Sequence, residues 1–254
     1  MLILSLNVVI KFLLKSKFTF LVSIDFIKLI KNSYYIICET ISLSGGKIQT
    51  KMTLQVKISK KLVPYKTAFS FLKKRVELVK RSNGKELIWV LEHPLTFTSG
   101  IRYKEDEILD KKIKVIKTNR GGKITLHSPG QKIVYFVLNL NKRKKDIKNL
   151  ITQIELSIID FLKLYKIKSN SDKENIGIWV KDKKIAAIGI RVSNWIAYHG
   201  FSININNNLE YYKKIIPCGL NNKKVTSVRT ESKTQIFNVE NKLRDIFLKN
   251  LKNI

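Results

Sequence analysis

The sequence predicts one α/β domain of the α+β type, in which a single mixed sheet is flanked by helices. Strand-like and helix-like segments alternate from Met52 onward. No Pro-rich or Ser-rich linker divides them, which favours one domain over two. With 254 residues, 44% of them hydrophobic, the chain is long enough to bury a substantial core.

The first part of this body is predicted to contain two strands with a helix between them. Residues 54–58 alternate in polarity, as a half-buried strand does. The helix begins at Pro64, because proline suits a first helical turn and apolar residues follow at helical spacing. The apolar run at 86–92 predicts a buried strand, and Pro94 ends it because proline cannot donate a ladder hydrogen bond.

The middle of the chain is predicted to supply three more strands and the longest helix. Short strands at 114–118 and 123–127 flank a glycine pair, and the apolar run at 133–140 predicts a buried strand. Residues 146–166 predict a helix, because isoleucine and leucine side chains recur along one face of it.

The last third is predicted to be an antiparallel meander followed by a helix. Its strands are expected at 176–180, 184–192 and 195–205, with the first turn at Asp182-Lys183. A final helix is expected over residues 238–251.

The chain is strongly basic, with a formal net charge of +30. Of its 49 basic residues, 41 are lysine and only 8 are arginine. Arginine is the residue that reads phosphates and bases bidentately, so its scarcity argues against a nucleic-acid interface. We interpret the charge as a solvated lysine surface that could attract an acidic protein partner, and a basic nucleic-acid-binding module is the more remote alternative.

Residues 1–51 differ from the rest, because apolar runs there are interrupted by lysines. None approaches the roughly 18–20 residues of a membrane span, and the first apolar run precedes the lysines, the reverse of a signal peptide. Two interpretations stay open for this N-terminal extension. It is either an amphipathic anchor, which would make a peripheral membrane protein, or a segment upstream of the true first residue, Met52. Residues 52–254 form the predicted functional domain.

Cys218 is the first candidate for chemistry. A lone cysteine is often a small buried hydrophobe, but this one lies between Pro217 and Gly219, in a predicted turn. A thiolate there could attack a carbonyl carbon. The other cysteine, Cys38, is far away in sequence, so we expect no disulfide and a reducing cytoplasm. The three histidines are widely spaced and no Cys-x-x-Cys occurs, so no metal site is expected.

Lys184 is the proposed partner of that cysteine. A small apolar run, Ile-Ala-Ala-Ile-Gly, follows it, so we expect it to begin a buried strand rather than to lie on a solvated face. Its ammonium would favour a thiolate nearby, and its amine could take and return protons. His127 and His199 adjoin glycine-containing turns, and we interpret both as structural histidines.

Arg120 precedes the glycine pair Gly121-Gly122 and could frame a site for a carbonyl or a phosphate. Isoleucine follows both Gly45-Gly46-Lys47 and Gly121-Gly122-Lys123, so neither run is a Walker-type phosphate loop. Taken together, these runs resemble the lipoyl(octanoyl) transferase family, the cysteine-dependent octanoyltransferases of lipoate synthesis. Between Met52 and Val228 the matching runs are Val63-Pro64-Tyr65, Glu92-His93-Pro94, Thr98-x-Gly100, Arg120 through His127, Pro129-Gly130-Gln131, Lys184 through Gly189, Arg191-Val192, Tyr198-His199-Gly200-Phe201, Asn204, Ile216-Pro217-Cys218-Gly219 and Val225-Thr226-Ser227.

The resemblance implies a fold like that of biotin and lipoate protein ligases, with 52–254 as the catalytic domain. It implies cytoplasmic transfer of an octanoyl group from acyl carrier protein to a lysine. The acceptors would be lipoyl domains of 2-oxoacid dehydrogenases and the glycine cleavage H protein. No cofactor is implied, because the donor thioester is already activated.

The family's nucleophile maps onto Cys218 and its lysine onto Lys184. The family's substrate-contact runs map onto Arg120, Gly121, Gly122, Lys123, Ile124, Thr125, Leu126, His127, Ala187, Ile188, Gly189, Gly200, Phe201 and Ser202. The nearest alternative is an ATP-dependent lipoate or biotin protein ligase on the same fold, which works through an acyl-adenylate and needs no cysteine.

Overall fold

The computed structural model describes residues 22–30, 33–44, 47–82, 84–172, 174–216 and 224–254, with side chains from Leu54 onward. The strands are β1 (Val22–Ile30), β2 (Ser33–Ser44), β3 (Lys47–Ser59), β4 (Glu86–Leu91), β5 (Thr96–Ser99), β6 (Val115–Lys117), β7 (Ile124–His127), β8 (Gln131–Asn139), β9 (Asn170–Ser171), β10 (Ile178–Val180), β11 (Lys183–Ser193), β12 (Ile196–Asn204) and β13 (Lys224–Val225). The helices are α2 (Tyr65–Lys80), α3 (Ile147–Lys163), α4 (Val228–Glu231) and α5 (Val239–Leu251), with 3-10 turns η1 (Glu105–Glu107), η2 (Leu140–Lys142) and η3 (Leu209–Lys214).

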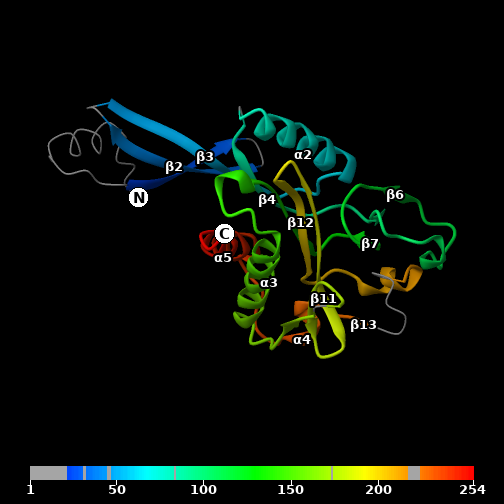
Figure 1. Ribbon diagram of the computed structural model, residues 1–254. Coiled ribbons are helices and arrows are strands. Elements are labelled where there is room, and N and C mark those ends of the chain that lie inside the picture. The colour runs from blue at the N-terminus through cyan, green and yellow to red at the C-terminus, as the bar shows by residue number, and fades with distance from the viewer. Residues whose placement is uncertain (1–21, 31–32, 45–46, 83, 173, 217–223) are drawn as a thin grey trace.

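One large mixed sheet runs through the molecule in the order β1-β2-β3-β4-β8-β12-β11-β10-β9, with β13 beside β11 (Figure 1). The β3–β4 and β11–β13 pairs are parallel and the other pairs are antiparallel. Helix α2 makes the crossover between the parallel strands β3 and β4, as a parallel pair requires. The predicted mixed sheet with flanking helices is confirmed. Strand β3 runs through position 52, where the sequence suggested a boundary.

The central strands of the large sheet bury both of their faces, because α2 lies on one side of them and α3 and α5 lie on the other (Figure 1). In β4 the side chains of Leu87, Trp89 and Leu91 pack with α2. The alternate side chains of Ile88 and Val90 pack with α3 and α5 on the opposite face. The period of two along a strand explains this division, and burial on both faces explains why the sequence of β4 is an unbroken apolar run.

Helix α5 closes the core on the α3 side. The Phe247 ring lies 5.7 Å from the Phe136 ring of β8 and 5.4 Å from the Phe201 ring of β12, measured between centroids. Phe136 and Phe247 are fully buried. This helix therefore belongs to the same core as the sheet and is not an appendage of it.

A smaller sheet of order β6-β5-β7 lies beside the large one (Figure 1). It has its own core, which includes Phe97, Ile124 and Leu126. The sequence did not predict β5, since its Thr-Phe-Thr-Ser run looks like a loop after Pro94. The smaller sheet supports the functional site, because the residues that follow β5 hydrogen-bond to the loop that precedes β7.

Several predicted boundaries were wrong, and two of them lie at turns. The predicted turn at Asp182-Lys183 lies at Lys181-Asp182, and Lys183 already pairs in β11. Lys181 has a φ of 55°, the left-handed conformation that such a tight turn requires. Helix α3 ends at Lys163 rather than 166, in a turn where Lys166 has a φ of 58°. Among the described residues, no helix has the length and apolar character that crossing a membrane would take.

Candidate active site

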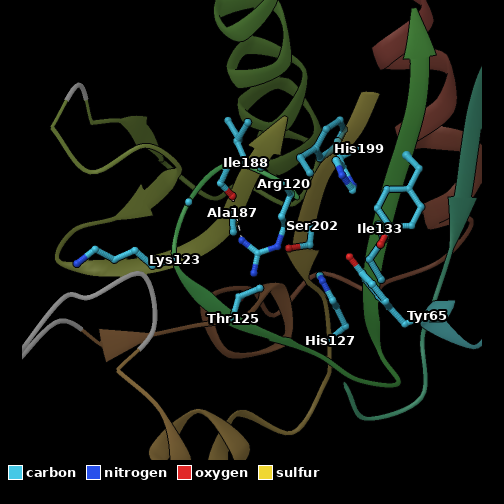
Figure 2. A pocket seen from close by; sticks show the side chains of 16 residues that line it. Tyr65, Arg120, Lys123, Thr125, His127, Ile133, Ala187, Ile188, His199 and Ser202 are labelled. Carbon is cyan, nitrogen blue, oxygen red and sulfur yellow. Dashed lines mark hydrogen bonds between the residues drawn. The ribbon is translucent and has the colours of Figure 1, made fainter. Parts of the chain in front are cut away.

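A narrow cavity, which we call the inner cavity, lies between α2, β8, β11, β12 and the segment 120–127 (Figure 2). Tyr65 enters it from the first turn of α2, and Ile133 and Tyr135 enter it from alternate positions of β8. On the other side, Ala187 and Gly189 of β11 face it. The inner cavity is thus bounded by the central strands of the large sheet and by one helix.

Aromatic and imidazole rings make up one wall of the inner cavity. The rings of Tyr65 and His127 stack with centroids 6.0 Å apart, and His93 packs edge-on against His127 at 5.5 Å. His93 Nε2 lies 2.9 Å from the Tyr135 hydroxyl, which also hydrogen-bonds to Tyr65. These polar groups therefore hydrogen-bond to one another, and the surface that they present to the cavity is that of their rings.

Burial keeps these rings uncharged at neutral pH. It lowers the pKa of His93 to about 4 and the pKa values of His127 and His199 to about 3. The positive charge of Arg120 acts in the same direction on His127 and His199. Burial also raises the pKa of the Tyr65 and Tyr135 hydroxyls. A wall of neutral rings suits an apolar guest.

Arg120 lies at the centre of the site, among the side chains of Thr125, Ala187 and Ser202 (Figure 2). One guanidinium nitrogen donates to the Thr98 carbonyl at 2.8 Å and to its hydroxyl at 3.0 Å, and the other donates to the Gly121 carbonyl at 3.0 Å. Its side chain thus ties β5 to the glycine loop. In this geometry these donors point at protein oxygens.

Lys184 is buried at the start of β11, only 7% exposed, as the sequence predicted. Its Nζ donates to the carbonyl oxygen of Ile176 at 2.9 Å and lies 5.3 Å from the centre of the Trp179 ring. It lines a neighbouring cavity rather than the inner one. Its amine is therefore held in a fixed place close to the glycine loop.

Cys218 lies outside the described residues. The chain is described again from Lys224, and Val225 of β13 is the direct register partner of Lys184. On the other side, the Ile216 amide donates to the Glu107 carbonyl at 2.8 Å. Both described ends next to the cysteine segment are therefore fixed, one of them beside Lys184.

The family of the chain follows from a match of residues 64–249 to the model of the lipoyl protein ligase A/B catalytic domain. The chain belongs to the lipoyl protein ligase A/B family. The match extends past Val228, where the quoted resemblance ended, and takes in most of α5. The packing of Phe247 into the common core explains why the family domain includes that helix.

Relatives within this family are octanoyltransferases. One from Wolbachia sp. subsp. Brugia malayi is 41% identical over 198 residues, which cover 76% of this chain and 97% of the relative. One from Wolbachia pipientis wMel is 43% identical over 176 residues, covering 67% and 86%. One from Bartonella tribocorum is 41% identical over 185 residues, covering 67% and 76%.

Solved structures of the same fold include lipoate ligases. Lipoate-protein ligase A bound with ATP superposes with a TM-score of 0.61 at 16% identity, covering 77% of this chain and 85% of the other. A bipartite lipoate protein ligase from Thermoplasma acidophilum gives a TM-score of 0.59 at 17% identity, covering 79% and 83%. At this identity the likeness concerns the fold alone, and it confirms the predicted lipoate-ligase fold.

The structure gathers most of the predicted substrate-contact residues of the lipoyl protein ligase A/B family around the inner cavity. Those that line it are Arg120, Gly121, Gly122, Lys123, Thr125, His127, Ala187, Ile188, Gly189, Gly200, Phe201 and Ser202. Ile124 and Leu126 do not, because alternate residues of β7 face the core of the smaller sheet. Lys123 extends away from the ring wall (Figure 2), and its ammonium pairs with Glu107 at 2.9 Å.

Four residues of the inner cavity were not predicted as contacts, namely Tyr65, Ile133, Tyr135 and His199. The alternation of β8 places Ile133 and Tyr135 on one face, so the pattern carried a signal for that pair. Tyr65 reaches the cavity from α2, and His199 lies on β12 beside the predicted contact Gly200 but was interpreted as a structural histidine.

Proposed function

We propose that this chain transfers an octanoyl group from octanoyl-acyl carrier protein to a lysine of lipoyl domains, through a thioester on Cys218. The observation that carries the proposal is the identity of about two residues in five with octanoyltransferases, over 97% of one relative. The acceptors we propose are lipoyl domains of 2-oxoacid dehydrogenases and the glycine cleavage H protein. We place the reaction in the cytoplasm, where a thiol stays reduced.

The inner cavity supports an apolar acyl group as the substrate. Its wall consists mainly of neutral rings and small β11 residues, and its two charged side chains, Arg120 and Lys123, are engaged with protein oxygens. Each methylene that leaves water for such a wall contributes about 0.8 kcal/mol. A chain of medium length therefore gains several kilocalories per mole, and a two-carbon group gains little.

In the first half-reaction the Cys218 thiolate attacks the carbonyl carbon of the donor thioester. The Lys184 amine has taken the thiol proton to form this thiolate, and the tetrahedral intermediate then collapses as the bond to the donor sulfur breaks. The departing thiolate takes the proton back from the Lys184 ammonium and leaves as a thiol. The acyl group remains on Cys218 as a new thioester, so no bond energy has to be supplied.

In the second half-reaction the neutral amine of the acceptor lysine attacks the carbonyl carbon of acyl-Cys218. A carbon–nitrogen bond forms and the bond to the Cys218 sulfur breaks. The amine proton passes through Lys184 to the cysteine thiolate, which restores the thiol. The product is an amide, and both steps use the same amine as a proton carrier.

Intact-mass measurement after brief mixing with octanoyl-carrier protein tests this proposal. We expect a mass increase of one octanoyl group that hydroxylamine removes, and that Cys218→Ser abolishes. Cys38→Ser is the matched control and should still become acylated. Full turnover by Cys218→Ser, or ATP-dependent attachment without an acylated enzyme, would overturn the proposal in favour of a ligase.

A further inference from the structure

A second cavity lies beside the inner cavity, between β11, α3 and the segments 120–123 and 174–176. We call it the outer cavity, and its volume is about 390 Å³. Its wall includes Arg102, Lys123, Glu174, Lys184, Ile188 and Ile190. The proposed chemistry uses Lys184 and assigns no role to the rest of this cavity.

A ridge of glycines separates the two cavities. Gly121, Gly122 and Gly189 line both of them, so backbone alone stands between the cavities at these positions. A Cβ at Gly121 would lie 2.9 Å from the Ile190 carbonyl oxygen, and the φ of 85° at Gly122 favours glycine. The two cavities therefore adjoin each other with no side chain between them at these three positions.

The outer cavity is positively charged. Within the described part of the chain, Glu174 is its one acidic wall residue, against the cations of Arg102, Lys123 and Lys184. Lys123 pairs with the carboxylate of Glu107, and Lys184 donates to a backbone carbonyl. Arg102 stands exposed at the rim, and its amide donates to the Gly122 carbonyl at 3.1 Å, which fixes it next to the ridge.

These features fit the polar half of the thioester donor. An acyl thioester on a carrier protein has an apolar chain on one side of its carbonyl carbon and a pantetheine arm ending in a phosphate on the other. Ile188 and Ile190 offer apolar contact along such an arm, and a guanidinium suits a phosphate at its end. The acceptor lysine is cationic until it loses its proton, so this positively charged rim disfavours its approach.

We propose that the outer cavity binds the phosphorylated pantetheine arm of the thioester donor, and that Arg102 contacts its phosphate. The inference rests on the proposed function and adds the half of the substrate that is not transferred. Carrier-protein and coenzyme A thioesters share this arm, so both are expected to use the cavity.

Paired donors that differ by one phosphate test the inference. Octanoyl-4′-phosphopantetheine and octanoyl-pantetheine are compared by the kcat/KM of Cys218 acylation. We expect the wild type to prefer the phosphorylated donor about tenfold, the scale of one charge-assisted hydrogen bond at an exposed rim. Arg102→Gln should reduce that preference to about one. Arg81→Gln, an exposed arginine at the end of α2, is the matched control and should keep it.

The outcomes separate the inference from the proposed function. If both donors acylate Cys218 equally well in the wild type, the arm site is wrong and the function stands. If octanoyl-carrier protein itself does not acylate Cys218, the proposed function fails. Arg102→Gln should also lower kcat/KM for octanoyl-carrier protein and octanoyl-coenzyme A alike. A loss confined to the carrier protein would show that Arg102 contacts the protein surface, and would overturn the arm site.

Discussion

Gly177 lies directly against the Lys184 side chain. A Cβ at Gly177 would stand 2.4 Å from Lys184 Cε and 3.0 Å from its Nζ. The same short segment supplies the Ile176 carbonyl that accepts from Nζ, and the Trp179 ring over which the ammonium lies. The lead-in to β10 therefore forms a close-fitting holder for this amine, and glycine is the residue that leaves room for it.

Gly177→Ala should displace the Lys184 amine and slow acylation of Cys218. A shift of about one ångström in a reacting group costs on the order of a hundredfold in rate, which sets the expected loss. The φ of 144° at Gly177 adds backbone strain, so a modest loss of stability is expected as well. A rapid-quench time course with octanoyl-carrier protein, analysed by intact-mass measurement, gives the acylation rate.

A double-mutant cycle separates the position of the amine from general damage. In a Lys184→Ala background the same Gly177→Ala change should cost no further acylation rate, because no side chain is left to displace. Equal losses in both backgrounds would mean that Gly177 acts on the fold and not on the amine.

Lys184→Ala should slow both half-reactions, by roughly a hundredfold or more for a lost proton carrier. Lys184→Arg is the informative partner, because it keeps the positive charge but cannot release a proton at neutral pH. We expect it to be nearly as slow as the alanine variant. Single-turnover acylation and deacylation rates report the two steps separately, and an unchanged acylation burst in Lys184→Ala would remove the lysine from the first step.

Stability should fall as the pH falls below about 6.5. Burial, and then the charges of neighbouring groups, hold the pKa of His127 at about 3 in the folded chain, below its ordinary 6.5. Between these values the unfolded chain binds a proton that the folded chain excludes, so the contribution is complete above pH 6.5 and is lost toward pH 3. At pH 5 this ring alone should cost about 2 kcal/mol of unfolding free energy.

His127→Gln provides the comparison for that pH effect. It removes one ring that resists protonation, so the difference in unfolding free energy between pH 7 and pH 5 should shrink by about 2 kcal/mol. Urea unfolding of both proteins at the two pH values measures this difference. An equal drop in both proteins would show that His127 does not carry the sensitivity.

The sequence predicted those elements whose burial leaves a regular pattern among neighbouring residues. The run of β4 is apolar at every position because both faces are covered, and the face of α3 repeats at helical spacing, so both were found. The burial of Lys184 was also foreseen, because a small apolar strand follows it. In each case neighbouring residues carry the signal.

Features that depend on contacts between distant segments were missed. Strand β5 is short and mostly polar, and it exists because Thr96–Ser99 pairs with β7 and β6. The close-fitting holder of the Lys184 amine depends on the carbonyl of Ile176, eight residues earlier in the chain. The outer cavity includes Arg102, whose backbone amide hydrogen-bonds to Gly122. No local sequence pattern predicts this hydrogen bond. Strand register and the packing of loops determine these features, and the periodicity of the sequence does not predict them.

Ala187→Leu should shorten the acyl chain that the enzyme prefers. Ala187 lies on β11 opposite Ser202 and faces the inner cavity, so a larger side chain there takes up space meant for the chain. Leucine adds three carbons, and each methylene shut out costs about fourfold in kcat/KM at 0.8 kcal/mol. The activity profile over donors of four to ten carbons should therefore shift by about three carbons toward shorter chains. Val192→Leu, on the same strand but packed into the α3-side core, should leave the profile unchanged. An unaltered preference in Ala187→Leu would place the acyl chain elsewhere.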